Sequence, residues 1–310
     1  MTRPDSPGPA RRIPVILDTD IGGDIDDTWA LAFMLRCPEL DIKLVTTDTG
    51  DTTYRAKIVA KLLEAAGRAD VPVGVGMPVV EAPSTQEPWV ASYDLAGYPG
   101  PVHDDGVGIL VETIMDSSEP ITLLCIGPVP NVQAALEREP RIAERARFVG
   151  MHGSVRRGYG GSETAAAEYN VASAPEACRA AFTAPWDVTI TPLDTCGVVQ
   201  LEGERYQAVR DCDDPLVQAV VENYRVWIDN CQWGQVFNPE TESSILFDTV
   251  AVYLAFSEEL LVMEELGLQV TDSGFTTVDE DATKVRAAMD WVDLSAFKDL
   301  LVERLILSAP

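Results

Sequence analysis

The 310-residue chain is long enough for one large α/β domain or two small ones, and its 46% hydrophobic content can supply a sizeable buried core. Its 50 acidic and 23 basic residues give a net charge of −27, which opposes binding to nucleic acid or to an anionic membrane and disfavours polyanionic substrates. The six cysteines include no C-x-x-C pair, so we interpret them as reduced, mainly structural thiols.

The N-terminal segment, MTRPDSPGPARR, is polar and proline-rich and has no apolar core of the kind found in signal peptides. No later stretch offers 18 uninterrupted apolar residues, so no membrane span is expected. We therefore expect residues 1–12 to be disordered and the protein to be soluble and cytoplasmic.

Short apolar runs alternate with segments of helical periodicity along the first two thirds of the chain. The runs predict strands at IPVILD, DIKLVTT, VPVGVG, ITLLCIG, RFVGM and DVTITPL. Helices are predicted at WALAFMLR, YRAKIVAKLLEAAG, residues 132–137 and PEACRAAF. This alternation predicts an α/β fold with an open, mainly parallel sheet, helices on both faces and a Rossmann-like core.

The remaining third is predicted to be mostly helical. Helical patterns cover residues 213–233 and 248–256, a strand pair is expected within residues 267–278, and a last helix within residues 293–307. Neither a repeat nor a low-complexity linker interrupts the chain. The expectation is one domain over residues 13–310.

The first strand leads into a dense acidic cluster. The stretch DTDIGGDIDD contains the five aspartates Asp18, Asp20, Asp24, Asp26 and Asp27. Two unit charges about 4 Å apart repel by roughly 4 kcal/mol at an effective dielectric near 20, so a folded cluster needs a counter-charge. The stretch runs from the C-terminal end of a strand into the start of a helix, which is where open α/β sheets bind ligands. A bound cation is the simplest counter-charge there.

Two other acidic motifs explain the cluster less completely. An EF-hand calcium loop needs a bidentate Glu at its twelfth position, but that position counted from Asp18 is Trp29. A haloacid dehalogenase-type phosphatase would use Asp18 and Asp20 with Mg²⁺, but it leaves Asp26 and Asp27 unexplained.

Zinc or nucleophilic catalysis finds little support. The sequence has only two histidines, His103 and His152, and no cysteine cluster beside them. It also lacks the phosphate-binding pattern G-x-x-x-x-G-K-[ST].

The acidic cluster resembles the N-terminal signature of the nucleoside hydrolase family, a strand followed by D-x-D-x-G-x-D-D, in a longer variant that ends in I-D-D. Other segments resembling the family follow in order: TTDTGDTTYRAKIVAKLLEAAG, VPVGVGMP, ITLLCIGPVPNVQAAL, EPRIAERARFVGMHG, AAAEYNVASAPEA and FDTVAV. The resemblance implies a nucleoside hydrolase-like fold, a tightly held Ca²⁺, and hydrolysis of a ribonucleoside to free base and ribose. By analogy it also implies a homodimer or homotetramer.

The resemblance assigns metal and catalytic roles by position. Asp20 would be the general base that activates a Ca²⁺-bound water, and Asp20, Asp27 and Asp248 would be carboxylate ligands. The main-chain carbonyl of Ile126 would complete the protein's share of the metal shell. Hard oxygen ligands of this kind suit Ca²⁺.

Further positions match residues that hold the ribose. Asp26, Asp51, Glu168 and Asn170 would bind its hydroxyl groups, and Ser162 matches a position that contacts the 5′-hydroxyl. A ring of carboxylates would also stabilise the oxocarbenium-like sugar that forms as the base departs.

The chain lacks the histidine that helps to protonate the leaving base in many members of the family. Many members have a histidine before the late aspartate, but here Phe247 precedes Asp248. General acid catalysis is typically worth about 10² to 10⁴ in rate, so substrates with good leaving groups are expected to react fastest. Phe247 can instead form an apolar or stacking wall for the base. His103, in PVHDDGVG, is the candidate replacement acid, and a surface-loop histidine is the alternative.

Simpler structural roles stay open for several of these residues. Asp248 can be only a helix N-cap, and Asp18 a capping or supporting carboxylate. Asp24 can be solvated, and Trp227 and Trp233 can be core residues rather than a stacking surface for the base. At the level of function, a nucleoside- or ribose-binding homologue without activity is the alternative to a hydrolase.

Overall fold

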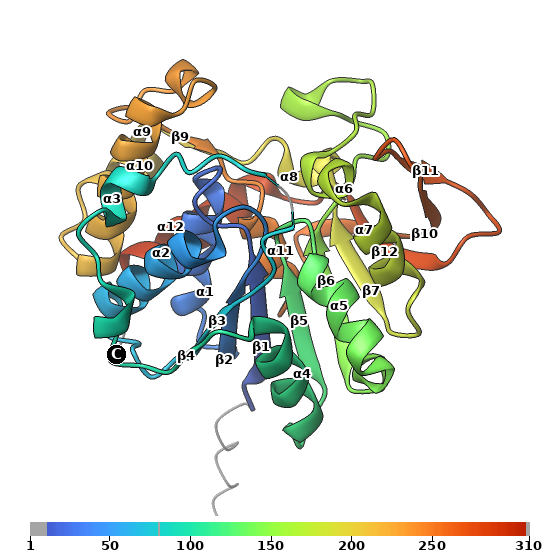
Figure 1. The fold of residues 1–310 in the computed structure, drawn as a ribbon. Helices are drawn as coiled ribbons and strands as arrows, with labels where there is room; N and C mark the ends of the chain where they lie inside the picture. Colours follow the sequence, from blue (N-terminus) through green and yellow to red (C-terminus); the bar gives the residue numbers. More distant parts are fainter. Residues whose placement is uncertain (1–10, 80, 308–310) are drawn as a thin grey trace, which may run out of the picture.

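The computed structural model describes residues 11–79 and 81–307, so most of the tail expected to be disordered lies outside it. A ten-stranded sheet forms the centre of the molecule, in the order β11-β10-β12-β7-β6-β5-β1-β2-β3-β4 (Figure 1). Its strands are β1 (Ile13–Thr19), β2 (Leu40–Thr47), β3 (Val73–Val75), β4 (Val102–His103), β5 (Ile121–Cys125), β6 (Ala146–Met151), β7 (Val188–Thr191), β10 (Leu261–Val270), β11 (Thr276–Val278) and β12 (Lys284–Trp291). Neighbouring strands from β12 to β4 are parallel, whereas β10 and β11 pair antiparallel. The predicted, mainly parallel α/β sheet is confirmed.

Helices cover both faces of the sheet, as predicted (Figure 1). Successive strand residues point to opposite faces, so Val15 and Leu17 of β1 pack in one apolar core and Ile16 in the other. The first core includes residues of α1 (Asp26–Leu35), α2 (Thr52–Ala65), α10 (Pro215–Asn230), α11 (Thr249–Leu254) and α12 (Leu294–Ile306). The second includes residues of α4 (Gly106–Asp116), α5 (Pro130–Arg138) and α7 (Pro175–Thr183).

Shorter elements complete the described chain. They are the helices α3 (Glu87–Val90), α6 (Tyr169–Ser173), α8 (Leu193–Cys196) and α9 (Gly203–Arg210), four 3₁₀ turns, and a separate antiparallel pair, β8 (Gln200–Glu202) with β9 (Glu242–Ile245). In the described part of the chain, no helix combines the length and apolarity needed to cross a membrane. All six cysteines are free and five are buried, which agrees with structural thiols.

The C-terminal third differs from the sequence-based expectation in several elements, including the unpredicted strand β9. The expected strand pair exists, with Leu268 opposite Val278, but β10 begins earlier, at Leu261. The additional strand β12 inserts between β10 and β7. Its central alanines weaken the alternation that would mark a strand in the sequence. The helix predicted to reach Trp233 ends at Asn230 as α10.

Helix α4 is also absent from the predicted set. Its sequence, GVGILVETIMD, begins with two glycines within three residues, which favours a turn over a helix. Asp105, just before the helix, supplies the missing start signal because its carboxylate accepts a hydrogen bond from the main-chain N–H of Gly108 at 2.8 Å.

Candidate active site

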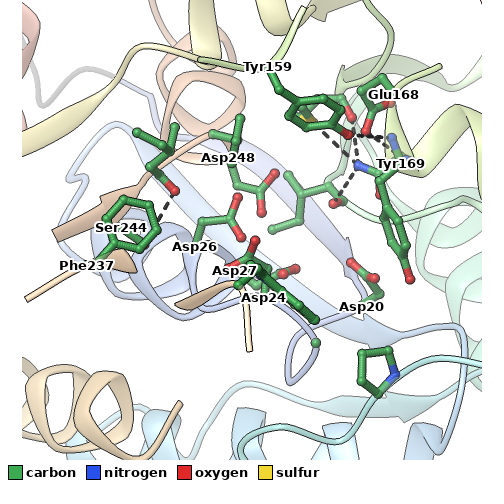
Figure 2. Close-up of a pocket in the computed structure, with 18 of the residues that line it drawn as sticks. Asp20, Asp24, Asp26, Asp27, Tyr159, Glu168, Tyr169, Phe237, Ser244 and Asp248 are labelled. Atoms are coloured by element: carbon green, nitrogen blue, oxygen red, sulfur yellow. Dashed lines mark hydrogen bonds between the residues drawn. The ribbon is translucent and has the colours of Figure 1, made fainter. Parts of the chain in front are cut away.

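Three buried carboxylates from distant parts of the chain meet at the C-terminal edge of the parallel strands. Asp26 and Asp27 open helix α1, as predicted, and Asp248 directly precedes α11. One carboxylate oxygen from each lies within 4.8 Å of the others. Figure 2 shows the three side chains gathered in the middle of a pocket. We call this group the acidic triad.

The acidic triad is electrostatically unfavourable without a cation. Burial raises the pKa of Asp26, Asp27 and Asp248 well above the usual value, and repulsion from neighbouring aspartates raises it further. Carboxylate oxygens are hard ligands, and several of them around one point match what a divalent cation such as Ca²⁺ or Mg²⁺ requires. The donor set of the acidic triad therefore fits a metal ion.

Asp248 occupies the N-cap position of α11 but makes no side-chain capping hydrogen bond. Its carboxyl group instead interacts with Asp26. The simple capping role considered for Asp248 therefore does not describe its side chain, which belongs to the acidic triad.

The set of metal ligands expected from the sequence differs from the acidic triad in one carboxylate. Asp20 and Ile126, two of the expected ligands, line the same pocket, but Asp20 is not part of the acidic triad. Asp26, expected to bind ribose, takes that place in the cluster. Burial raises the pKa of Asp20, and Arg55 opposes this shift.

The pocket has a volume of about 540 Å³ and two chemically different parts. Its acidic part contains six carboxyl groups, from Asp20, Asp24, Asp26, Asp27, Glu168 and Asp248. Its aromatic part contains Tyr159, Tyr169, Trp233, Phe237 and Phe247. The size and the mixed lining suit a small molecule with one polar and one flat, aromatic half.

Glu168 and Asn170 lie on the polar side of the pocket, around the start of α6. The Glu168 carboxylate accepts main-chain hydrogen bonds from Gly153 at 2.9 Å, Asn170 at 2.7 Å and Val171 at 3.2 Å. Burial raises the pKa of Glu168 to about 7. The Asn170 amide donates to the main-chain oxygen of Ile126 at 3.1 Å. Both side chains are thus held in fixed orientations beside the acidic triad.

Three residues expected at the site do not line the pocket. Asp51 is exposed and caps helix α2, Ser162 is exposed in the loop before α6, and His103 lies in β4 at the edge of the sheet. The second histidine, His152, is fully buried away from the pocket lining, and burial lowers its pKa to about 4. The structure therefore brings neither imidazole to the candidate site.

The structure distinguishes between the alternative roles considered for Asp18, Asp24 and the two tryptophans. Asp18 is fully buried and accepts hydrogen bonds from Thr46 at 2.5 Å and Asn131 at 2.7 Å, so it is a supporting residue. Asp24 lines the pocket, and burial raises its pKa to about 6. Trp227 is a core residue, whereas Trp233 lies beyond α10, is about half exposed and lines the pocket.

Arg55 is a site residue that sequence reasoning missed. It is buried behind the loop that follows β1, where its Nε donates to the Thr49 oxygen at 2.6 Å and its Nη1 to the Ile21 oxygen at 2.8 Å. Its charge opposes the raised pKa values of Asp20 and Asp27. A signal exists in the sequence, because the arginine shares the apolar helical face of the segment YRAKIVAKLL.

Asp48 is a second buried residue that the sequence did not single out. Neither of its carboxyl oxygens has a hydrogen-bond partner among the described residues. Burial and the nearby Asp18 and Asp20 raise its pKa well above the usual value. Close packing shapes this region, since a Cβ at Gly127 would lie 3.0 Å from Asp48 Oδ1 and 2.9 Å from the Asp20 nitrogen.

Buried carboxylates fit for a metal, placed in a small-molecule pocket at the C-terminal edge of a parallel sheet, define the site of an α/β enzyme. Residues 15–299 match the family model described as inosine-uridine preferring nucleoside hydrolase. The chain therefore belongs to the nucleoside hydrolase family and is a hydrolase that acts on N-glycosidic bonds. This membership decides against the phosphatase as an alternative.

Similar proteins span the same length as this chain. Pyrimidine-specific ribonucleoside hydrolase RihA of Shigella boydii is 28% identical over 94% of this chain and 98% of its own. The RihA protein of Salmonella agona is 29% identical with the same coverage. Among solved structures, a plant nucleoside hydrolase matches with TM-score 0.80 and 22% identity over 97% of this chain and 100% of its own. A purine-preferring ribonucleoside hydrolase from Gardnerella vaginalis matches with TM-score 0.74 and 20% identity, over 94% and 98%.

Proposed function

We propose that the protein hydrolyses the N-glycosidic bond of a ribonucleoside or close analogue, giving free base and ribose, with Ca²⁺ as its metal and Asp20 as the general base. The observation that carries this proposal is the buried acidic triad beside Asp20, Glu168 and Asn170 in one pocket. This arrangement provides a cation site, a proton acceptor and fixed polar groups for a sugar within a single cavity.

The metal would be held by oxygen atoms already gathered at the site. Asp27 and Asp248 supply carboxylates of the acidic triad, and Asp20 and the carbonyl of Ile126 extend the donor set. When bound, Ca²⁺ would orient the ribose diol and lower the pKa of a coordinated water. Asp26, placed in the triad, is available to the metal and to a ribose hydroxyl.

Asp20 would accept the proton of the water that attacks the anomeric carbon. The C–N bond then breaks, and the bonding electron pair leaves with the base. Negative charge from the surrounding carboxylates stabilises the positive charge that develops on the sugar. Arg55 supports the ionised form of Asp20, which a general base requires.

The ribose and the base would occupy the two parts of the pocket. Glu168 and Asn170 face the sugar, and Phe247 forms part of the wall beside the base. The roles of Asp51 and Ser162 as further sugar contacts and of His103 as a proton donor stay predictions. None of the three residues lines the pocket.

The proposal is tested by measuring free sugar released from a panel of purine, pyrimidine and p-nitrophenyl ribosides, together with the metal content of the same sample. We expect cleavage, close to one Ca²⁺ per chain, and loss of activity on chelation. Asp20→Asn should reduce kcat at least about 10²-fold, whereas Asp272→Asn, at an exposed position, should not. Equal cleavage by Asp20→Asn and the parent enzyme would overturn the role of Asp20.

We further propose that residues 13–310 act as a single catalytic domain in a cytoplasmic homodimer or homotetramer. The family match over residues 15–299 supports the single domain, and the family resemblance supports the homo-oligomer. Light scattering on the purified protein measures the oligomeric state, and a monomer with full activity would contradict the assembly.

A further inference from the structure

The lining of the pocket is negatively charged throughout its polar part. Six carboxyl groups line it, and no lysine, arginine or histidine does so among the described residues. A bound divalent cation and the buried Arg55 behind the loop would together supply three positive charges. The six carboxyl groups carry six formal negative charges. Electrostatics at this site therefore favours a ligand that carries positive charge.

The aromatic part is a rigid surface built on the buried Trp227. The Trp233 ring meets Trp227 edge to face with centroids 6.4 Å apart, and Phe237 stacks on Trp227 at 6.5 Å. Trp233 and the carboxyl group of Asp24 line the same part of the pocket, and Trp233 lies close enough to lower the pKa of Asp24. An aromatic face beside a carboxylate is a favourable environment for a flat cation.

The opposite aromatic group consists of Phe247 and Tyr159, whose rings meet edge to face at 6.1 Å. The phenol oxygen of Tyr159 accepts the main-chain N–H of Tyr169 at 2.9 Å. In Figure 2, Phe237 from the first group and Tyr159 from the second lie on different sides of the acidic triad. A flat ring entering between them would meet aromatic carbon on more than one side.

Apart from its carboxyl groups, the pocket lining offers few proton donors for a departing base. No imidazole lines the pocket, and the hydroxyl of Ser244 donates to the Ile245 oxygen at 3.4 Å. The phenol of Tyr169 is a weak acid, since burial raises its pKa to about 12. A neutral base that leaves with the electron pair of the broken bond needs such a proton, whereas a base that is already cationic leaves as a neutral molecule without one.

We propose that the preferred substrates are N-ribosides of a positively charged aromatic ring, of which the N-ribosylpyridinium ions are the simplest class. This inference rests on the proposed function and specifies its substrate class. Water adds its oxygen to the anomeric carbon and gives its proton to Asp20. The C–N electron pair passes to the ring nitrogen and neutralises the ring. The products are ribose, a neutral pyridine base and one proton, so atoms and charge balance.

The test compares kcat/KM for nicotinamide riboside, uridine, inosine and p-nitrophenyl riboside under the same conditions with Ca²⁺ present. Nicotinamide riboside carries a cationic ring, whereas p-nitrophenyl riboside offers a good but neutral leaving group. We expect nicotinamide riboside to exceed uridine and inosine by at least about 10-fold, as a missing general acid implies. A preference for uridine or inosine would overturn the inference.

The same panel separates this inference from the proposed function. Cleavage of p-nitrophenyl riboside without cleavage of nicotinamide riboside would overturn the cationic substrate class and leave the hydrolase intact. Cleavage of no riboside would overturn the proposed function and the inference with it.

Variants at the aromatic wall give a second measurement. Asp24→Asn and Trp233→Leu should each lower kcat/KM for nicotinamide riboside by about 3- to 30-fold, the range of a cation–aromatic contact at a partly buried site. For p-nitrophenyl riboside the loss should be smaller in both variants, because its ring is neutral, and Trp233→Phe should retain part of the selectivity for the cationic ring. Asp94→Asn, outside the pocket, is the matched control for the charge change. An equal loss on both substrates would refute recognition of the cation by this wall.

Discussion

Replacement of Arg55 by methionine tests how the loop that carries Asp20 is held. The Arg55 side chain is 1% exposed and donates to the main-chain oxygens of Thr49 at 2.6 Å and Ile21 at 2.8 Å. Methionine fills much of the same space but removes both donors and the only positive charge that opposes the shift of Asp20. The variant therefore leaves two buried carbonyl groups without their charged partner.

The expected loss of stability follows from these contacts. A hydrogen bond that involves a charged group is worth about 1.5–3 kcal/mol, and breaking a buried charged network by removing one member costs about 3–5 kcal/mol. We expect Arg55→Met to lower the free energy of unfolding by about 3–5 kcal/mol. At roughly 2 °C per kcal/mol for a chain of this length, Tm should fall by about 6–10 °C.

The same substitution should move the pH dependence of the reaction. Arg55 lowers the pKa of Asp20, so its removal raises that pKa and reduces the ionised fraction at a given pH. The acid limb of the kcat profile should therefore shift to higher pH. A uniform loss of activity at every pH would indicate displacement of the loop without an electrostatic effect.

Thermal unfolding and the kcat profile on p-nitrophenyl riboside, both at saturating Ca²⁺, measure the two effects. Arg55→Lys keeps the charge and one donor and should fall between the parent and Arg55→Met. The control is Arg68→Met, because Arg68 is a partly exposed residue in the turn after α2 that pairs with Asp70 at 2.9 Å. Such surface pairs contribute about 0–1 kcal/mol. A Tm for Arg55→Met within 2 °C of the parent, with an unchanged acid limb, would refute this account of Arg55.

Three further predictions follow from the site. The pKa values of Asp18 and Asp24 are raised to about 6, and that of Glu168 to about 7. These groups therefore bind more protons in the folded than in the unfolded state. Their contribution to stability is present below about pH 4 and is lost as pH rises through 6 and 7. Chelated protein should accordingly lose Tm between pH 5 and pH 7.5, and added Ca²⁺ should raise Tm more at pH 7.5; a chelated Tm that rises with pH would contradict this sign. Asp248→Asn should weaken Ca²⁺ binding at least about 10-fold by calorimetry, because it removes one charge from the acidic triad, and unchanged affinity would remove Asp248 from the metal site. Cleavage of p-nitrophenyl riboside should exceed that of inosine by at least about 10²-fold, and similar rates would reveal a proton donor that the pocket lining does not show.

The fold was largely predictable because its central strands carry strong local patterns. The strand before Asp18 and the helix that begins at Asp26 follow directly from an apolar run and an acidic helix start. Strand β12 was not predictable in this way, because Ala287 and Ala288 leave no clear alternation and its pairing with β7 depends on the assembled sheet. Local patterns identify elements, but only tertiary packing places such a strand.

Some residues of the site can likewise be identified from sequence motifs, whereas others are placed only by packing in the folded protein. The resemblance to the family placed Asp27 and Asp248 together although they are far apart in the chain, and the acidic triad agrees with that pairing. It gave no information about Trp233, whose position depends on the end of α10 and on packing against Trp227. Arg55 was missed because a lone arginine in a helix is usually read as a solvated residue.

The five aspartates after the first strand are held in the fold by different means, which explains how so many like charges can be buried together. Asp18 accepts hydrogen bonds from neutral donors, and Asp24 accepts one from the main-chain N–H of Ile25 at 2.6 Å. Arg55 opposes the charge of Asp20. Asp27 also accepts a hydrogen bond from the Thr19 hydroxyl, but among the five only Asp26 and Asp27 share the acidic triad with Asp248. Removal of the metal should therefore disturb the start of α1 and of α11 more than the end of β1. Hydrogen exchange of the chelated protein would show increased exchange at both helix starts, and uniform exchange across the β1–α1 loop would argue against this division.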